Sequence, residues 1–325
     1  MKELIMKHTH LTVIVICLIG AAGCSPKESP STPSRGNLNI AYSKLRISLP
    51  IFVAQEEGIF AKNHLNVTLN GYDTAQPMAQ AIAEGKVDIA GYTALPITFN
   101  AMLRAGKPLY YLTAMIEDKD HRISYFLKRK GDHSINSLKD LAGKRIGILP
   151  TNAYKSWANQ ILKAVGANGA QIIQVAPQQE LASLKSGTVS CLFTNDPMAT
   201  AALANGVGEV IDREPACPQY LGDPFIFGSF NVTKTWADQH PAEFTELKSS
   251  LNEAISFIAA NEAKAKQDMV KYIPAIFQKQ VSLYPDALYW KTDKAASVGF
   301  DKIEAEYERD KIVPSKVDLK GLVQP

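Results

Sequence analysis

Apolar and polar positions along the chain alternate in a way that predicts an α/β fold. Short apolar runs, which predict buried strands, are separated by longer stretches in which apolar residues recur every three or four positions, which predict helices. The first such series predicts strands at 38–42, 67–69 and 87–90, with helices at 49–57 and 76–84 between them. This alternation is typical of parallel-rich sheets flanked by helices.

The same order of elements recurs about a hundred residues later, which indicates an internal repeat. Strands are predicted at 145–149, 171–175 and 189–193, and helices at 154–165 and 178–185. Two such units predict two lobes, each with a sheet whose carboxyl-end loops face a shared ligand cleft.

The connections between the repeats define the expected lobes. A polar stretch at 117–124 and a turn-rich stretch at 212–224, which precedes an apolar run at 225–232, predict two crossings. We therefore expect lobe 1 to contain 38–120 and 218–325, and lobe 2 to contain 121–217. Further helices are predicted from Pro96 to Gly106 and at 236–260, 263–272 and 296–307.

The N-terminus predicts export. Lys2 and Lys7 precede an apolar run at 11–19 that is too short to cross a bilayer, as in a secretory signal peptide, which we place at 1–23. The signal ends in Ala21-Ala22-Gly23-Cys24, which resembles a bacterial lipobox and predicts a lipid on Cys24. Ordinary cleavage that leaves Cys24 as a thiol is the alternative. Residues 24–37, rich in Ser and Pro, predict a flexible tether.

Composition and charge exclude several classes of function. The formal net charge of +3 is mild, and no basic face is concentrated enough to indicate nucleic-acid binding. His64, His121, His133 and His240 are scattered, without metal-ligand spacing, and neither a nucleophile elbow nor a phosphate loop occurs. We therefore expect no enzyme activity, no cofactor and no metal.

Two cysteines remain in the predicted lobes once the signal and the lipid site are set aside. Cys191 and Cys217 either form a disulfide in the oxidising compartment or are buried thiols, and the sequence leaves both alternatives open.

Three sequence motifs resemble those of a known family: A-x-x-E-G-x-V-D-x-A-G-Y-T from Ala81, G-K-R-I-G-I-L-P-T-N-A-Y from Gly143, and N-D-P from Asn195. With the lipobox and the repeat, they resemble periplasmic solute-binding proteins of ABC importers, in the sulfonate, nitrate and taurine group. Its relatives also bind thiamine-pyrimidine precursors. The resemblance covers residues 38–322.

This resemblance implies a two-lobed periplasmic-binding-protein fold, type II-like, with the ligand cleft between the lobes. It implies a monomer, lipid-anchored to a bacterial membrane and facing the periplasm or the cell exterior. Lobe closure on a small polar, anionic organic solute would precede delivery to an ABC permease. Import of a thiamine-pyrimidine precursor or another heterocycle, and a sensory lipoprotein that signals to a partner, are the alternatives.

Candidate binding residues follow the predicted strands. Thr151 begins a helix, whose free N–H groups and positive dipole end suit an oxyanion, although it is equally suited to be a helix cap. Lys44 and Arg46 are cations able to neutralise such an anion, Asp73 is either a cap or a ligand contact, and Tyr92 is either a cleft wall or a core residue.

The expected site therefore lies at the strand ends of both lobes. Gly91 would allow a ligand to approach the backbone, and Asp196 would either contact an amine or ring N–H or cap a helix. The expected contact residues are Tyr42, Ser43, Lys44, Asp73, Gly91, Tyr92, Thr93, Thr151, Asn152, Ala153, Tyr154, Asn195, Asp196 and Ser229.

Overall fold

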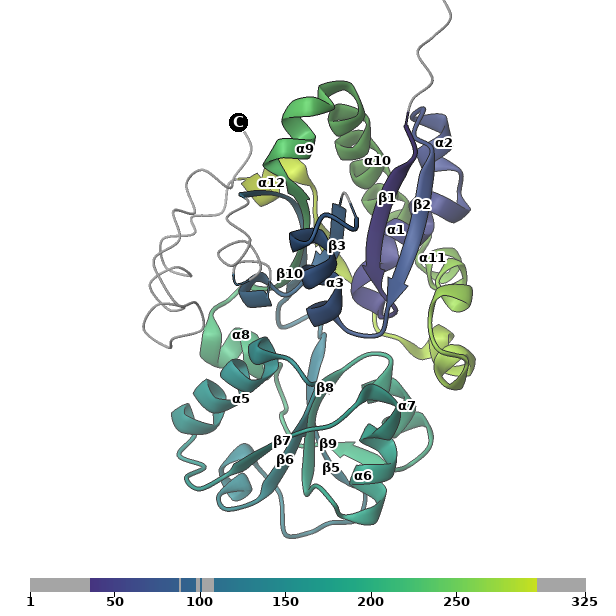
Figure 1. The fold of residues 1–325 in the computed structure, drawn as a ribbon. Coiled ribbons are helices and arrows are strands. Elements are labelled where there is room, and N and C mark those ends of the chain that lie inside the picture. The colour runs from purple at the N-terminus through teal and green to yellow at the C-terminus, as the bar shows by residue number, and fades with distance from the viewer. Residues whose placement is uncertain (1–35, 88, 98–99, 101–107, 297–325) are drawn as a thin grey trace, which may run out of the picture. The chain divides into compact units, whose positions relative to one another are not determined.

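The computed structural model describes residues 36–296 apart from 88, 98–99 and 101–107 (Figure 1). They belong to the unit that begins at Gly36. The predicted signal peptide, almost all of the tether, most of the helix after Pro96 and nearly all of the helix at 296–307 lie outside the described residues.

The first sheet has six strands in the order β11-β4-β10-β3-β1-β2. Strand β1 pairs in parallel with β2 and β3, as the first repeat predicts, whereas β10 runs antiparallel to β3 and β4, and β11 antiparallel to β4. The strands are β1 (Leu38–Ser43), β2 (Val67–Tyr72), β3 (Ile89–Thr93), β4 (Leu109–Glu117), β10 (Phe225–Thr233) and β11 (Leu288–Trp290).

The second sheet has five strands in the order β7-β6-β8-β5-β9. Strand β6 pairs in parallel with β7 and β8, and β5 runs antiparallel to β8 and β9. The strands are β5 (Ser124–Arg129), β6 (Arg145–Ile148), β7 (Gln171–Gln174), β8 (Cys191–Asn195) and β9 (Gly208–Val210). The chain leaves the first sheet after β4 and returns to it at β10, so both sheet changes fall in the stretches predicted as crossings.

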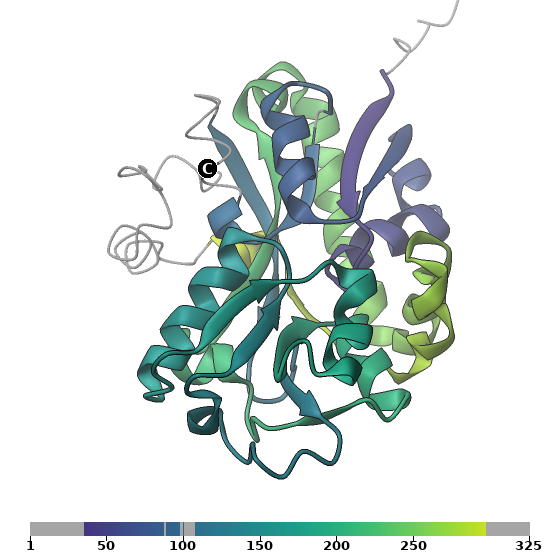
Figure 2. The ribbon, with the colours of Figure 1, turned by 60° about the horizontal axis from the view of Figure 1, so that its bottom comes forward.

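Helices cover both sheets, with α5 on one side of the second sheet and α6 and α7 on the other (Figures 1 and 2). The helices are α1 (Leu49–Glu56), α2 (Ile59–Lys62), α3 (Ala75–Ala83), α5 (Asn152–Ala164), α6 (Glu180–Ser186), α7 (Met198–Ala204), α8 (Ala216–Leu221), α9 (Lys234–Gln239), α10 (Pro241–Ala260), α11 (Glu262–Asp268) and α12 (Thr292–Ala296). Short 3-10 helices are η1 (Arg46–Ser48), η2 (Leu138–Leu141), η3 (Pro177–Gln179), η4 (Val270–Tyr272) and η5 (Ala275–Leu283).

The prediction of a single helix at 236–260 is wrong. Helix α9 ends at Gln239 and α10 begins at Pro241, because His240 between them has φ −129° and ψ 56°. A proline disfavours helical backbone in the residue before it, and its missing N–H suits the first turn of the next helix. The helix predicted at 263–272 is likewise divided into α11 and the 3-10 helix η4.

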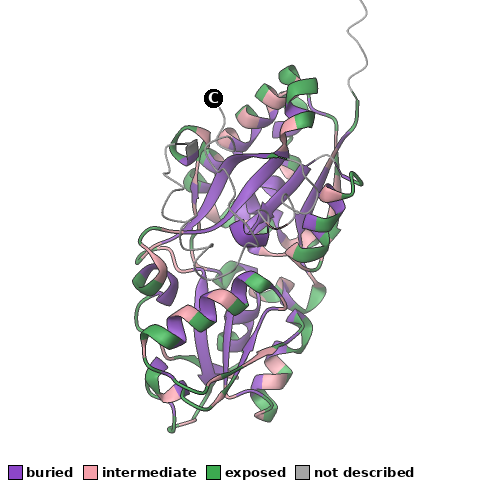
Figure 3. Ribbon diagram, turned by 60° about the vertical axis from the view of Figure 1, so that its left-hand side comes forward, coloured by how far each residue is buried: buried purple, intermediate pink, exposed green. Residues whose placement is uncertain are grey.

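The inner strands of both sheets are largely buried, whereas the edge strands β2 and β7 contain no buried residue, and the outer faces of the helices are exposed (Figure 3). Aromatic side chains connect the two sheets, since Trp157 of α5 packs against Phe225 and Phe227 of β10, with ring centroids 5.1 and 5.5 Å away. Cys191 and Cys217 are buried and free, so the disulfide alternative is excluded. Among the described helices, none has the length and apolar character needed to cross a membrane.

Candidate functional site

A pocket lies where loops from both sheets meet, with about 470 Å³ of unfilled space when the part open to solvent is included. It is formed by the ends of β1, β3 and β8, by residues that follow β1, β2 and β3, by β10, and by residues that follow β6 and β7. Its lining residues are Ser43, Leu45, Ile47, Asp73, Thr74, Ala75, Tyr92, Thr93, Ala94, Ile97, Leu149, Thr151, Tyr154, Pro177, Asn195 and Phe227. The strand-end position expected from the sequence is therefore where the structure has a pocket.

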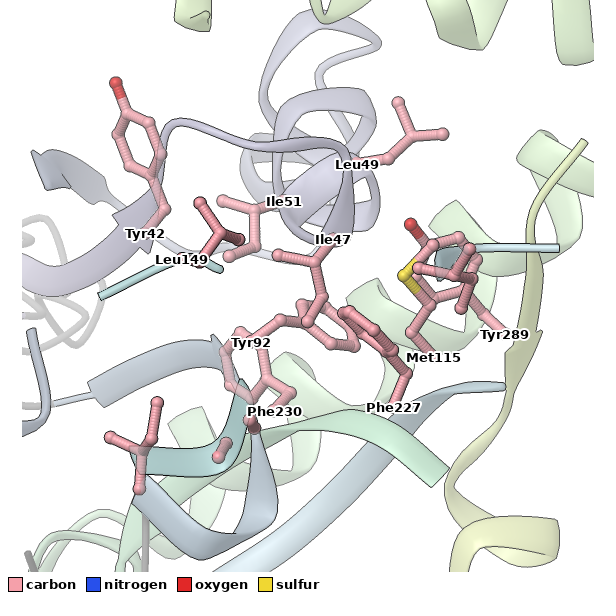
Figure 4. Packing of buried hydrophobic residues seen from close by; sticks show 14 of the residues in the cluster. Tyr42, Ile47, Leu49, Ile51, Tyr92, Met115, Leu149, Phe227, Phe230 and Tyr289 are labelled. Carbon is pink, nitrogen blue, oxygen red and sulfur yellow. The ribbon is translucent and has the colours of Figure 1, made fainter. Parts of the chain in front are cut away.

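Much of the pocket wall is apolar. Ile47, Tyr92, Leu149 and Phe227 contribute side chains to it (Figure 4), and Ile97 extends the same wall. Sequence reasoning missed the aliphatic residues and Phe227, because an apolar residue in a strand or helix pattern has the same signature whether it faces a core or a ligand. A pocket of this kind accommodates an organic body better than a bare inorganic ion.

The second sheet contributes Thr151, Tyr154 and Asn195 to the polar part of the pocket. The Thr151 hydroxyl accepts a hydrogen bond from the Tyr154 backbone N–H at 3.2 Å, so Thr151 caps α5 and also lines the pocket. Tyr154 Oη and Asn195 Oδ1 are buried and lack a hydrogen-bond partner among the described residues. Burial raises the pKa of Tyr154 well above its usual range, which keeps the hydroxyl protonated. Both residues line the pocket, so two unpaired polar atoms belong to its wall residues.

Tyr92 combines the two roles considered for it. Its ring lines the pocket, while the residue is fully buried and its hydroxyl lies 2.7 Å from Thr113 Oγ1. Thr93 beside it also lines the pocket, and its Oγ1 accepts from Asn231 Nδ2 at 3.2 Å. Tyr92 therefore offers a solute an apolar face rather than a hydroxyl.

Both cations considered for anion binding are paired with aspartates. Lys44 Nζ donates to Asp73 Oδ1 at 2.9 Å, and Arg46 Nη2 lies 3.4 Å from Asp196 Oδ2. Asp73 lines the pocket but does not cap α3, whose N-cap is Thr74. Asp196 does not line it, and its Oδ1 accepts from the Thr200 backbone N–H at 3.0 Å in the first turn of α7, whose N-cap is Pro197.

The space beside Gly91 is occupied by protein. A Cβ built at this position would lie 2.6 Å from both the Ala41 carbonyl oxygen and Ile51 Cδ1. Glycine is therefore required here for the packing of β3 on β1 and α1, and Gly91 does not line the pocket.

The remaining expected contact residues also lie outside the lining. The Tyr42 ring packs edge-on against Phe52, with ring centroids 5.2 Å apart, and Ser229 Oγ donates to Asn231 Oδ1 at 2.9 Å. Of the fourteen predicted residues, those that do not line the pocket are Tyr42, Lys44, Gly91, Asn152, Ala153, Asp196 and Ser229. Those brought together around it are Ser43, Asp73, Tyr92, Thr93, Thr151, Tyr154 and Asn195.

The crossing from the first sheet to the second is fixed by a buried carboxylate. Glu117 Oε1, at the end of β4, accepts from the backbone N–H groups of Ile123 and Ser124 at 2.9 and 2.7 Å. Burial raises the pKa of Glu117 to about 7, against the hydrogen bonds that lower it. Beside it, Arg122 Nη1 lies 3.1 Å from Asp212 Oδ2 at the return crossing. Both connections are thus held by local polar contacts.

A second buried carboxylate predicts a pH dependence of stability. Glu180 accepts from Thr194 Oγ1 at 2.6 Å, and burial raises its pKa to about 8. The folded protein therefore holds a proton that the unfolded chain, with a carboxyl pKa of about 4.3, has released. The contribution of Glu180 to the free energy of unfolding is fully present below the pKa that its carboxyl group has in the unfolded chain. This contribution is lost as the pH rises through the folded pKa of about 8.

We expect E180Q to gain stability relative to the wild type, by about 3–4 kcal/mol, between about pH 5 and about pH 8. Urea unfolding across this range measures the difference. E214Q, at an exposed glutamate, is the control and should differ from the wild type by a constant amount. Parallel pH profiles for E180Q and the wild type would show that Glu180 does not carry a raised pKa.

No group of three or more His, Cys, Asp or Glu side chains able to hold a metal ion occurs within the part of the chain that the structure describes.

Comparison with known proteins identifies the family of the chain. Residues 31–274, about three quarters of the chain, match the NMT1-like family. The chain belongs to the NMT1-like family. Among solved structures it resembles the alkanesulfonate-binding protein SsuA from Xanthomonas axonopodis pv. citri, bound to MOPS, with a TM-score of 0.69 and 17% identity over 90% of this chain and 99% of that one. The periplasmic-binding-protein fold expected from the sequence is confirmed.

Curated relatives of this NMT1-like chain include transport and biosynthesis proteins. The nitrate import ATP-binding protein NrtC of Synechocystis sp. is 23% identical over 73% of the chain. A putative thiamine biosynthesis protein of Haemophilus influenzae is 25% identical over 83% of this chain and 85% of its own length. The chain spans only 37% of NrtC, so NrtC contains regions without a counterpart here.

Proposed function

We propose that this protein is the extracytoplasmic solute-binding component of an ABC importer, that it acts as a monomer, and that it catalyses no reaction. The observation that carries this proposal is the pocket, because its lining comes from strand-end loops of both sheets. A solute in that position contacts both lobes at once, so its binding energy favours the closed arrangement over the open one. Delivery of the closed form to a membrane permease is part of the proposal, supported by the nitrate-import relative.

The pocket supports a small organic solute with an apolar body and a polar head. Leu45, Ile47 and Phe227 suit the body. The head would meet Thr151, Tyr154 Oη and Asn195 at the beginning of α5 and the end of β8, where the helix N-terminus favours an electron-rich atom. An anionic head of the sulfonate or nitrate type is the first candidate, in line with the SsuA resemblance.

A heterocycle is the second candidate, and a specific observation favours it. The pocket lining contains no lysine, arginine or histidine among the described residues, and Lys44 and Arg46 both face aspartates. A ring with N–H groups would use the buried Asn195 and Tyr154 oxygens as acceptors. The thiamine-related relative from Haemophilus influenzae is consistent with this class of solute.

A thermal-shift screen of sulfonates, nitrate, carboxylates and pyrimidines tests the proposal. A solute that binds only the folded protein raises the melting temperature, by an amount that increases with its affinity and concentration. X-ray scattering with the best compound at saturation should show a smaller radius of gyration than without it. Identical scattering profiles at saturation would contradict lobe closure.

Export with lipid anchoring at Cys24 belongs to the same proposal and rests on the lipobox-like sequence that precedes this cysteine. We expect C24A to move the protein from the membrane fraction to the soluble extracytoplasmic fraction, because the thioether-linked lipid has no other attachment point. C191A, at a buried thiol, is the control and should stay with the membranes. Unchanged fractionation of C24A would contradict the anchor.

A further inference from the structure

We infer that Asp73 and Asp196 determine the charge preference of the pocket, by neutralising the two cations of its first loop, so that the bound solute carries an uncharged polar head group. This inference rests on the proposed solute-binding function. Of the two solute classes proposed for the pocket, it selects the heterocycle over the anion of the sulfonate or nitrate type.

The first loop of the pocket alternates lining residues with cations. Ser43, Leu45 and Ile47 line the pocket, and Lys44 and Arg46 occupy the positions between them. A protein that captures an oxyanion could direct either cation at the ligand. Here both side chains are directed at carboxylates instead.

The Lys44 pair lies at the edge of the pocket. Asp73 is itself a lining residue, and its Oδ1 accepts from Lys44 Nζ at 2.9 Å. Both side chains are partly exposed, at 37% for Lys44 and 60% for Asp73. An anion that entered here would meet the Asp73 carboxylate before it could use the ammonium group.

The Arg46 pair lies deeper and crosses from the first sheet's loop to the end of β8. Arg46 and Asp196 side chains are 2% and 0% exposed, with Nη2 and Oδ2 3.4 Å apart. Arg46 also donates to the carbonyl oxygens of Pro285 at 2.6 Å and Arg122 at 3.1 Å, which hold it away from the pocket. Asp196 directly follows the lining residue Asn195. Its negative charge therefore cancels the positive charge of Arg46 next to the polar side of the pocket.

The donors that remain at the pocket are neutral. Thr93, Thr151, Tyr154 and Asn195 can hydrogen-bond a head group, and α5 adds only the partial positive charge of its N-terminus. Burial of a full negative charge beside two neutralised cations costs more than burial of an uncharged head with the same hydrogen bonds. The aspartates therefore exclude anions by removing the positive charge that would attract them.

The test is the affinity of methanesulfonate for charge variants, measured by calorimetry at low ionic strength. We expect D73N to bind methanesulfonate at least about fivefold more tightly than the wild type, because Lys44 is released at the pocket edge. The double variant K44M/D73N is the matched control and should lose the gain. D196N should gain affinity in the same direction, and R46M/D196N should not.

Equal methanesulfonate affinity in D73N and the wild type would overturn the inference, as would tighter binding of methanesulfonate than of 4-aminopyrimidine by the wild type. If D196N fails to fold, the comparison of D73N with K44M/D73N tests the inference by itself. The Lys44–Asp73 pair is partly exposed, so these variants should fold. The proposed function fails by a different result, namely a screen in which no solute raises the melting temperature.

Discussion

Replacement of Arg46 by methionine is expected to lower the free energy of unfolding by about 3–5 kcal/mol, because it removes one partner of a buried ion pair. Asp196, which is fully buried, would keep its charge without the guanidinium 3.4 Å away. The carbonyl oxygens of Pro285 and Arg122 would also lose their donors. Urea unfolding of R46M and the wild type at one pH measures the difference.

The control for R46M is K44M, which breaks the exposed pair with Asp73 and should cost no more than about 1 kcal/mol. R46M/D196N should recover part of the loss, because the double variant leaves no uncompensated charge in the interior. An R46M protein within about 1 kcal/mol of the wild type would show that the pair does not stabilise the fold.

Replacement of Ala75 by tryptophan is expected to weaken solute binding at least about 100-fold, a loss of about 2.8 kcal/mol. Ala75 is the first residue of α3, is half-buried and lines the pocket, so an indole at this position occupies space that the solute needs. Because Ala75 is not fully buried, the fold should tolerate the change. Calorimetric titration with the compound that gives the largest thermal shift measures the effect.

The matched control is Q76W on the same helical turn. Gln76 is exposed and does not line the pocket, so this variant should bind within about twofold of the wild type. Wild-type affinity in A75W would exclude the pocket as the solute site.

The repeated strand-helix-strand units could be predicted from the sequence because local signals define them. Apolar runs mark β1, β6 and β8, and Gly187 ends α6 with a φ of 78°, which glycine adopts readily. The antiparallel strand β9 and the edge strand β11 have only three residues each, too few for a periodic pattern. Which strand pairs with β10 depends on contacts between distant residues, and a local pattern does not contain them.

The candidate site was predictable in its position and less so in its composition. Thr151 and Asn195 could be identified because each follows a predicted strand of a parallel pair. Lys44 and Arg46 were reasonable anion ligands by type, but the carboxylates that neutralise them are distant in the sequence, at Asp73 and Asp196. A charge balance of this kind becomes visible only when the fold brings those loops together.

A crystal structure of the protein with the best compound of the thermal-shift screen tests the solute-binding proposal at the level of atoms. We predict that the compound lies in the pocket, in contact with Thr93 from the first sheet and with Thr151 or Asn195 from the second. A compound bound elsewhere, with the pocket left empty at saturating concentration, would contradict the proposal.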